Sequence, residues 1–520
     1  MNDEQKLLLD LLIRTDKFLK KRNINYYLDG GTAIGAIRHN GFLPWDDDAD
    51  IYMTRDEYKK MISYSNEFSE INADLACFET YPDYSKTAAR ISDLNNTMII
   101  KSDIFHGKAN GQSIDVFILD PVPSDKIDEY SKNLCLYEEI LTYNYVVNNR
   151  VYDYIDEYKE YLVKEKELGR EATLKELKES IEKYSQEESD KFILRWGNIP
   201  MVYDKEVFGT PRYINFEGYM LPCPQKTEAF LRTQFGYDWY IIPKAEHQVN
   251  HDLYINNEIS SNNYVNDFNE FVNEDEAEYN LKNRKIYWVE NIGNKMIMDK
   301  VELLLQAKKL EMQFEMDKKE SILTNLYKSK NYEEFINIMD PFIENIKTFI
   351  DCSYIPDIKL EIYLKEIYLL ILSGRHYDAK KLYNLVKKDN NDNEQLNQLK
   401  DLITLIEKID SYYQDKELIK VENEIKNLNE TYNMIPNVIN AKIEIELLKD
   451  SKSKNIDEIY SLCENYLQYF PNNYDVLKKK GDILYFIGDK EKAINLFKRV
   501  IKNSNNGLIL LELKEKYDLN

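Results

Sequence analysis

The stretch LDGGTAIGAIRHNGFLPWDDDADIYM, residues 28–53, decides how the first part of this chain folds. A glycine pair ends a short apolar run, and a segment of helical composition follows it. Four aspartates then fall within five positions, directly ahead of the apolar triplet at 51–53. Crowded carboxylates repel one another, and an acidic turn in solvent does not need apolar flanks. The stretch therefore predicts a strand, a helix and a second strand whose carboxylates hold a ligand.

A divalent cation is the simplest ligand for these carboxylates. Mg²⁺ binds oxygen atoms in octahedral geometry, and catalytic sites supply a few carboxylates and leave the other positions to water and substrate phosphates. Side chains two apart on a strand face the same way, so Asp48 and Asp50 are predicted to share one cation. Asp46 extends the same face, whereas Asp47 is expected to turn away. The predicted metal is Mg²⁺, with Mn²⁺ as a substitute; the alternative is an acidic turn in solvent.

The glycine pair predicts a phosphate site next to the metal. Gly30, Gly31 and Thr32 end one strand and open a helix, where backbone N–H groups without helical partners meet anions. A glycine pair alone is weak evidence. Combined with a helix and an Asp-x-Asp strand within about 20 residues, it is a specific pattern.

The flanking sequence up to about residue 255 alternates short apolar runs with helical stretches. Besides 25–31 and 49–53, strands are expected at 74–79 and 113–120, and Thr54 is a plausible N-cap for the helix that follows it. This pattern favours an α+β catalytic domain over residues 1–255. Residues 256–315 are interpreted as a linker and connecting helix.

The remaining residues, 316–520, are expected to be entirely helical. The segment 475–503 has the composition of a helical hairpin, and 362–388 aligns with it. Gly374 falls on Gly488 and Ala379 on Ala493, an offset of 114 positions in both pairs, or three periods of about 38. The hairpin at 475–503 resembles a tetratricopeptide repeat (TPR), which predicts a solenoid that binds a partner protein. The alternative is a plain helical bundle.

Composition limits the classes of partner. Lys plus Arg number 69 and Asp plus Glu number 92, a formal net charge of −23 that disfavours nucleic acid and anionic lipid. No window approaches 18 apolar residues, so no transmembrane segment is expected. The five cysteines are scattered without a CxxC pair, which favours reduced thiols in a cytoplasmic protein.

Residues 28–51 resemble the signature of the LicD family, bacterial phosphotransferases similar in fold to the nucleotidyltransferases of the DNA polymerase β superfamily. The resemblance covers roughly residues 20–255 and includes IDVF at 114–117 and the closing segments from 216 to 251. It implies a nucleotidyltransferase-like mixed sheet. It also implies that Asp115 is the third carboxylate and that His251 contacts substrate.

The activity implied by the resemblance is the transfer of a phosphocholine-type group from a CDP-activated alcohol onto a glycan or lipid-linked glycan acceptor. Such acceptors are precursors of lipopolysaccharide, teichoic acid or capsule. Asp48, Asp50 and Asp115 are then the catalytic residues. Asp115 either deprotonates the acceptor hydroxyl or shares a second metal. Arg38 and Arg90 are candidates to bind phosphate oxygens, and ordinary salt bridges are the alternative for each.

Two further readings remain open at this point. The same fold also suits a nucleotidyltransferase that moves NMP from an NTP onto a sugar or a protein, and an inactive domain fused to a scaffold is the non-enzymatic alternative. His247 and His251 are spaced i, i+4, which on a helix suits a zinc pair, although no cysteine lies near them. His39 is expected to position the loop at 40–41.

Overall fold

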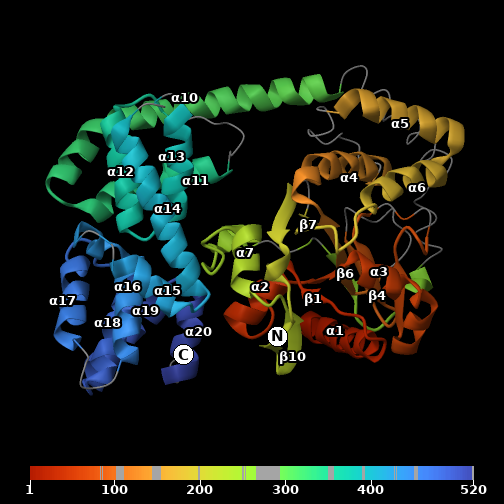
Figure 1. The fold of residues 1–520 in the computed structure, drawn as a ribbon, viewed down its shortest axis with the longest axis horizontal. Coiled ribbons are helices and arrows are strands. Elements are labelled where there is room, and N and C mark those ends of the chain that lie inside the picture. The colour runs from red at the N-terminus through yellow and green to blue at the C-terminus, as the bar shows by residue number, and fades with distance from the viewer. Residues whose placement is uncertain are drawn as a thin grey trace. The chain divides into compact units, whose positions relative to one another are not determined.

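The computed structural model divides into two compact units, both drawn in Figure 1. The first comprises Met1–Trp239 and Pro243–Met298, and the second comprises Tyr240–Ile242 and Asp299–Asn520. The structure describes residues 1–81, 84, 86–100, 110–142, 154–196, 199–248, 251, 253–264, 293–348, 356–388, 390, 393–426, 428, 430–449 and 455–517.

A mixed sheet forms the centre of the first unit. Within the described ranges it has seven strands in the order β1-β2-β6-β4-β3, with β7 also pairing with β6 and β8 pairing with β7. Strands β2 and β6 run parallel, whereas the other neighbours are antiparallel. The strands are β1 (Tyr27–Leu28), β2 (Ala49–Thr54), β3 (Ala73–Ala76), β4 (Ala89–Asp93), β6 (Ser113–Val122), β7 (Lys191–Trp196) and β8 (Ile199–Asp204).

Strand β6 is the common partner of three other strands. Along one edge it pairs with β2 from Ile114 to Leu119. Along the other edge, β4 pairs with residues 113–116 and β7 pairs with residues 119–122. Phe117 and Ile118 therefore lie in a gap between the β4 and β7 ladders.

The helices of the first unit are positioned by local signals in the sequence. Helix α1 (Asp3–Lys21) begins with a capping box, in which Asn2 and Gln5 bond to each other's backbone N–H. Thr54 caps α3 (Arg55–Ile62), as predicted. Helices α2 (Gly30–His39) and α7 (Thr227–Phe235) contact each other. Three further helices pack around a small apolar core: α4 (Ile127–Thr142), α5 (Ile155–Leu168) and α6 (Arg170–Ile181).

Two small antiparallel sheets complete this unit. One consists of β9 (Arg212–Phe216) and β10 (Tyr219–Cys223), and the other of β5 (Thr97–Ile100) and β11 (Leu253–Asn256). The turn between β9 and β10 contacts the loop after α2, because the Glu217 N–H donates to the Asn40 carbonyl at 2.7 Å.

The predicted order of a mixed sheet domain followed by a helical region is confirmed. Three strands differ in length from their predictions. Strand β1 comprises only Tyr27–Leu28 of the predicted 25–31, and β3 ends at Ala76 rather than at residue 79, whereas β6 continues through Pro121 to Val122. Strand β2 ends at Thr54, opposite Leu119. Beyond that point β6 has no described strand on this edge, which is where a proline without an N–H is tolerated. Residues 265–292 of the predicted linker and connecting helix lie outside the described residues.

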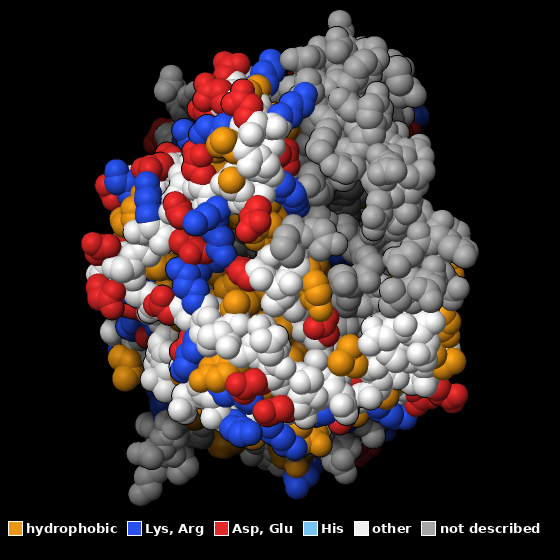
Figure 2. All heavy atoms as spheres, turned by 90° about the vertical axis from the view of Figure 1, so that its right-hand side faces the viewer, with side chains coloured by type: hydrophobic (Ala, Val, Ile, Leu, Met, Phe, Trp, Pro, Cys, Tyr) orange, Lys and Arg blue, Asp and Glu red, His pale blue; other side chains and the backbone are white. Residues whose placement is uncertain are grey.

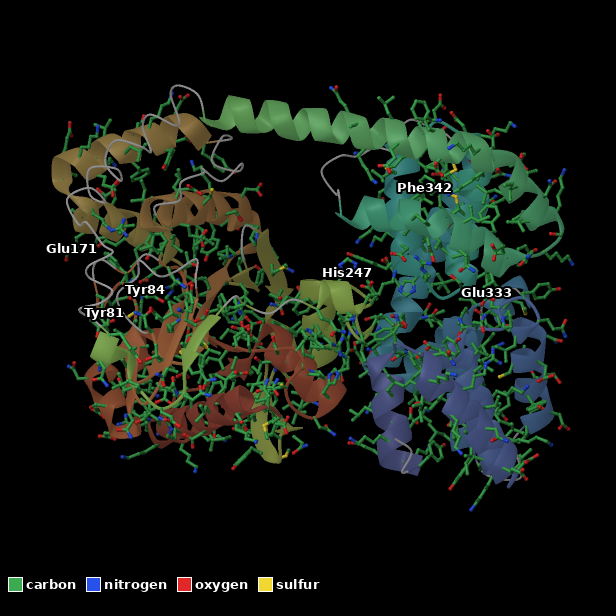
Figure 3. All side chains as sticks on the ribbon, turned by 180° about the vertical axis from the view of Figure 1, so that it is seen from behind. Tyr81, Tyr84, Glu171, His247, Glu333 and Phe342 are labelled. Carbon is green, nitrogen blue, oxygen red and sulfur yellow. The ribbon has the colours of Figure 1, made fainter. Side chains whose placement is uncertain are left out.

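The second unit consists mainly of helices, which pack around two apolar cores. The larger core extends from α10 to α18, and the smaller one is formed by α18, α19 and α20. Phe342 of α11, labelled in Figure 3, is one of the buried side chains of the larger core. The helices are α10 (Gly293–Lys328), α11 (Tyr332–Thr348), α12 (Leu360–Leu372), α13 (His376–Lys388), α14 (Glu394–Gln414), α15 (Leu418–Lys426), α16 (Pro436–Leu448), α17 (Ile456–Leu467), α18 (Tyr474–Phe486), α19 (Lys490–Asn503) and α20 (Gly507–Tyr517).

Both helical hairpins expected from the sequence are present. Helices α12 and α13 turn at Gly374, and α18 and α19 turn at Gly488, each glycine with a φ near +90° that side chains with a Cβ rarely adopt. Gly481 of α18 lies against the ring of Phe497, where a Cβ would come within 2.4 Å of a ring carbon. The small residue thus allows close packing of the two helices.

The described surface combines charges of both signs. On the face shown in Figure 2, Lys and Arg side chains are interspersed with Asp and Glu. Across the described part of the chain, no helix combines the length and the apolar character needed to cross a membrane.

Candidate active site

Four carboxylates gather where β2 and β6 begin. Asp50, the second residue of β2, pairs directly with Asp115 of β6, and Asp46 and Asp48 lie in the segment that leads into β2. Burial, and after it repulsion from neighbouring carboxylates, raises the pKa of Asp46 to about 8 and also raises the pKa of Asp50. The pKa of Asp48 is raised by burial as well, although His251 opposes the shift. The group therefore needs protons or a cation to compensate its charge.

The donor set fits a hard divalent cation. Carboxylate oxygens are the ligands that Mg²⁺ takes, and the buried Oδ2 of Asp46 has no hydrogen-bond partner among the described residues. An orphaned buried oxygen beside three other carboxylates is what a cation would satisfy.

The glycine pair lies directly under the carboxylates. A Cβ on Gly31 would approach Asp46 Oδ2 to 2.7 Å, and one on Gly30, whose φ is +52°, would approach Asp50 Oδ2 to 3.0 Å. The Thr32 hydroxyl accepts a hydrogen bond from the Asp50 N–H at 2.9 Å, which ties the start of β2 to α2. These three residues therefore position the aspartates at the N-terminus of α2.

Asp29 is a member of the site that the sequence analysis missed. It is fully buried and caps α2, and its Oδ1 accepts hydrogen bonds from the Gly30 N–H and from Gln234 of α7. Burial raises its pKa to about 6, against the effect of these hydrogen bonds. An aspartate just before a helix-opening glycine pair is an N-cap signal, which was available from the sequence.

Asp115 has a permanently cationic partner on the neighbouring strand. Arg90 of β4 donates through Nε to Asp115 Oδ1 at 2.8 Å. Burial disfavours its charged form, but the attraction of Arg90, supported by Lys86 and His251, holds the pKa of Asp115 below its usual range. Arg90 is therefore engaged in an ion pair within the site.

Asp47 contacts His251, contrary to the expectation that it turns away. Its carboxylate accepts from the His251 backbone N–H and lies 2.8 Å from Nδ1 of the ring. Asp47, Asp48 and His251 each offer a ligand atom within 4.8 Å of the others. The alternation of side chains along a strand does not apply to Asp47, because β2 begins only at Ala49. The hydrogen bond to Asp47 raises the pKa of His251, although burial opposes it.

Arg38 is buried beneath the loop that leads to the aspartates. Its Nη1 donates to the Trp239 carbonyl at 3.1 Å, and its guanidinium lies 5.8 Å from the centre of the Trp45 ring. Burial lowers its pKa to about 10, while Asp46 opposes the shift. The His39 ring meets Trp45 edge-on, with 6.2 Å between centroids. Both side chains thus pack against Trp45, next to the acidic segment.

His247 and His251 do not form the helical pair that a zinc reading requires. His247 is exposed and ends the short 3-10 turn η6 (Ala245–His247), where Figure 3 labels it. Gln248 then has an extended backbone. Within the described residues, therefore, no α-helix joins the two histidines.

Comparison with known proteins agrees with this geometry. Residues 23–132 match the model of the family described as LicD/FKTN/FKRP, nucleotidyltransferase domain. The lipopolysaccharide cholinephosphotransferase LicD of Haemophilus influenzae is 35% identical over 127 residues, which are 24% of this chain and 46% of that protein. An uncharacterized protein of Rickettsia prowazekii is 31% identical over 84 residues, 16% of this chain and 32% of its own length.

The chain thus spans less than half the length of these relatives. The matched segment runs from the end of α1 to the first turns of α4, and it contains all four clustered carboxylates. Residues 23–132 therefore carry a LicD family domain.

Proposed function

We propose that the protein is a metal-dependent phosphotransferase that moves a phosphocholine-like group from a CDP-activated alcohol onto a glycan precursor of the cell surface. The observation that carries the proposal is the carboxylate cluster at the start of β2 and β6, placed over the N-terminus of α2. The printed name of the Haemophilus influenzae relative supports the choice of transferred group.

Asp46, Asp48, Asp50 and Asp115 would hold Mg²⁺. When bound, the cation neutralises a diphosphate and polarises the oxygens of the bond that breaks. The chain's own residues prepare this site before substrate arrives. The Gly30–Gly31 backbone leaves room for two carboxylates, and Thr32 anchors the backbone of Asp50.

Asp115 acts in this proposal as a ligand rather than as a general base. An efficient base has a pKa near the working pH, whereas the ion pair with Arg90 holds the pKa of Asp115 low. His251, whose pKa is raised by Asp47, is suited to donate a charge-assisted hydrogen bond to a phosphate oxygen.

The test is the release of CMP from CDP-choline in the presence of Mg²⁺, with EDTA as the blank. We expect Asp48→Ala and Asp50→Ala each to lower the rate at least a hundredfold while the proteins stay folded. Asp128→Asn, at an exposed position of α4, is the matched control and keeps the wild-type rate. Equal CMP release in EDTA would contradict the proposal.

The same assay separates the runner-up function. A nucleotidyltransferase would take an NTP and release pyrophosphate while its NMP is transferred. Pyrophosphate release from CTP, without CMP release from CDP-choline, CDP-ribitol or CDP-glycerol, would favour that reading.

We also propose that the helices of the second unit form TPR-like repeats that recruit a protein partner or the glycan carrier. The two hairpins that turn at Gly374 and Gly488 support this reading. A chain ending at residue 298 is expected to release CMP at the wild-type rate and to transfer less efficiently to the natural acceptor. Unchanged transfer by the shortened chain would contradict a recruiting role.

A further inference from the structure

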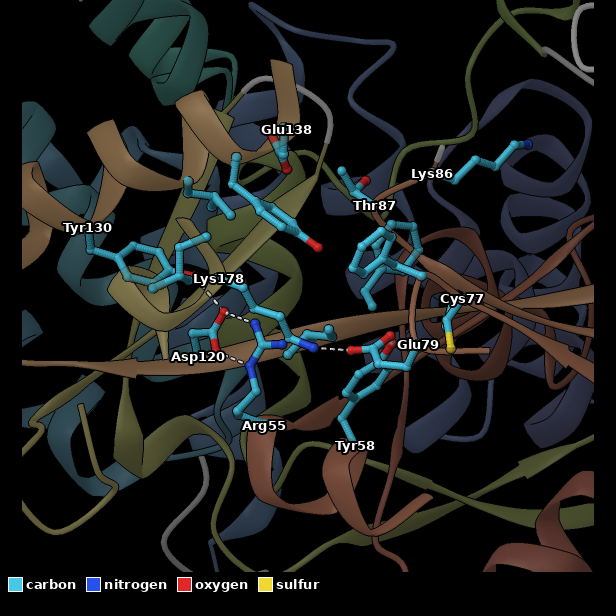
Figure 4. Close-up of a pocket in the computed structure, with 17 residues that line it drawn as sticks. Arg55, Tyr58, Cys77, Glu79, Lys86, Thr87, Asp120, Tyr130, Glu138 and Lys178 are labelled. Carbon is cyan, nitrogen blue, oxygen red and sulfur yellow. Dashed lines mark hydrogen bonds and ion pairs between the residues drawn. The ribbon is translucent and has the colours of Figure 1, made fainter. Parts of the chain in front are cut away.

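A cavity of about 60 Å³ lies at the gap between the β4 and β7 ladders of the first unit. By its volume it has room for about five water molecules, at roughly 10–15 Å³ each. Phe117 and Ile118 of β6 line it together with residues of α3, α4 and α6, and Figure 4 shows it in close-up. It is distinct from the carboxylate cluster, which lies at the other end of β2.

The lining combines aromatic rings with ion pairs that are already satisfied. Arg55 binds Asp120 through two hydrogen bonds of 2.7 Å each, and Lys178 forms an ion pair with Glu79. Both pairs appear as dashed lines in Figure 4. Their charges cancel within the wall, so they do not select an anion. The aromatic residues of the lining are Tyr58, Phe78, Phe117, Tyr130 and Tyr137.

Aromatic rings around a cavity of this size suit a quaternary ammonium group. Ring faces attract a cation through their quadrupole, and methylated ammonium groups are bound in aromatic cages. The buried carboxyl group of Glu138 also lines the cavity, and a bound cation would favour its charged form. A polyol would instead need several hydrogen-bond partners, and the Arg55 guanidinium and the Lys178 ammonium are already directed at carboxylates in the wall.

The cavity is within reach of the proposed phosphate site. Phe117 follows Asp115 by two positions on β6, which places their Cα atoms roughly 7 Å apart and their side chains on the same face. Lys86 belongs to the cavity lining and also acts on the charge of Asp115. In Figure 4 its side chain extends away from Arg55 and Asp120. In phosphocholine, only four bonds separate phosphorus from nitrogen.

We propose that this cavity binds the quaternary ammonium group of the donor while its phosphates lie at the aspartates. The inference rests on the proposed function for the identity of the donor. The cavity would then select a donor with a cationic alcohol over donors with ribitol or glycerol.

The first test uses calorimetry to measure the binding of choline chloride to the full chain. Its uncharged isostere, 3,3-dimethylbutan-1-ol, is the matched ligand control and is expected to bind at least tenfold more weakly. Tyr137→Leu and Glu138→Gln should each weaken choline binding about tenfold, whereas Tyr137→Phe keeps the ring and binds as wild type. Tyr184→Leu, half-buried just after α6 and outside the lining, is the protein control.

The second test is kinetic and separates this inference from the proposed function. Tyr137→Leu should raise KM for CDP-choline about tenfold and leave KM for CDP-glycerol unchanged. If Tyr137→Leu and Glu138→Gln release CMP with unchanged choline binding and unchanged KM for CDP-choline, the inference is overturned and the proposed function stands. Equal binding of choline and the neutral isostere, or preferential binding of ribitol, would also overturn it. If no donor releases CMP, the function fails and calorimetry alone decides on the cavity.

Discussion

At the scale of single residues, alanine substitutions at two glycines of α2 should have different effects on Mg²⁺ affinity and on stability. A Cβ on Gly31 would lie nearest to the Asp46 carboxylate, whereas a Cβ on Gly35 would lie 2.3 Å from the Gly41 carbonyl oxygen. Gly31→Ala should therefore displace a metal ligand and lower Mg²⁺ affinity at least tenfold. It should also keep or gain up to about 1 kcal/mol of stability from helix propensity. Gly35→Ala should lose about 1–3 kcal/mol because backbone has to move.

Calorimetric Mg²⁺ titration and thermal unfolding measure the two effects separately. Wild-type Mg²⁺ affinity in Gly31→Ala would show that Asp46 does not act as a ligand from its present position. An unchanged Tm in Gly35→Ala would show that the loop at 41–43 yields without cost.

Asp47 and His251 give a prediction about protonation. The imidazole owes its raised pKa first to the hydrogen bond with Asp47, so Asp47→Asn should lower the pKa of His251. Because the folded-state pKa is raised, the pair stabilises the fold below about pH 6.5, the usual histidine value. This contribution is lost as the pH rises through the folded-state pKa. A proton NMR titration in EDTA measures the change, with Asp56→Asn as the control, and an unmoved pKa would contradict the assignment.

The sequence predicted most residues of this candidate site but not the contacts between them. The Asp-x-Asp pattern and the glycine pair were recognisable in the sequence because they combine charged residues with strand and turn signals. The link between Arg90 and Asp115 was not, since it depends on the antiparallel pairing of β4 with β6. The contact of Asp47 with His251 joins residues 204 positions apart, and no local pattern encodes it.

At the scale of elements, helix α12 carries a buried acid that makes stability depend on pH. Glu366 is fully buried, and neither of its carboxylate oxygens has a hydrogen-bond partner among the described residues. Burial raises its pKa well above the usual value, Asp340 and Asp378 add to the shift, and Arg375 opposes it. A carboxyl whose pKa is raised on folding destabilises the fold as pH rises above its unfolded value of about 4.3.

Glu366→Gln should therefore raise Tm at pH 8 and leave it nearly unchanged at pH 4, where wild-type Glu366 is also uncharged. Thermal unfolding across that range measures the difference. Glu361→Gln, at an exposed position of the same helix, is the matched control. Parallel Tm curves for wild type and Glu366→Gln would contradict the shift.

Most elements could be predicted from periodicity and capping, as with α3 after Thr54 and the hairpin that turns at Gly488. The order of strands could not be derived from residue patterns alone. Placing β6 between β2 and β4 depends on long-range pairing, and the gap at Phe117–Ile118 arises only because two separate strands share one edge of β6.

At the scale of the whole molecule, metal and nucleotide should stabilise the fold together. A ligand that binds only the native state adds RT ln(1 + [L]/Kd), about 2.7 kcal/mol at a hundredfold excess over Kd. Mg²⁺ alone keeps most of its water, and a diphosphate supplies oxygens that replace it. We therefore expect small shifts in Tm with Mg²⁺ or CDP-choline alone and a clearly larger shift with both.

Asp48→Ala should lose the combined shift, because it removes one of the proposed metal ligands. Differential scanning fluorimetry of the full chain is sufficient for the measurement. An equal shift by CDP-choline in EDTA would show that the nucleotide binds without a metal at the aspartates.

The central place of β6 also has a consequence for the growing chain on the ribosome. Among the described strands, only two short ladders can form before residue 113 is made, β1 with β2 and β3 with β4, and each is too small to be stable alone. The two ladders have no pairing with each other until β6 enters between them. The same strand delivers Asp115 opposite Asp50. A nascent chain should therefore become resistant to protease and competent to bind metal at the same length, once residues 113–122 have left the exit tunnel.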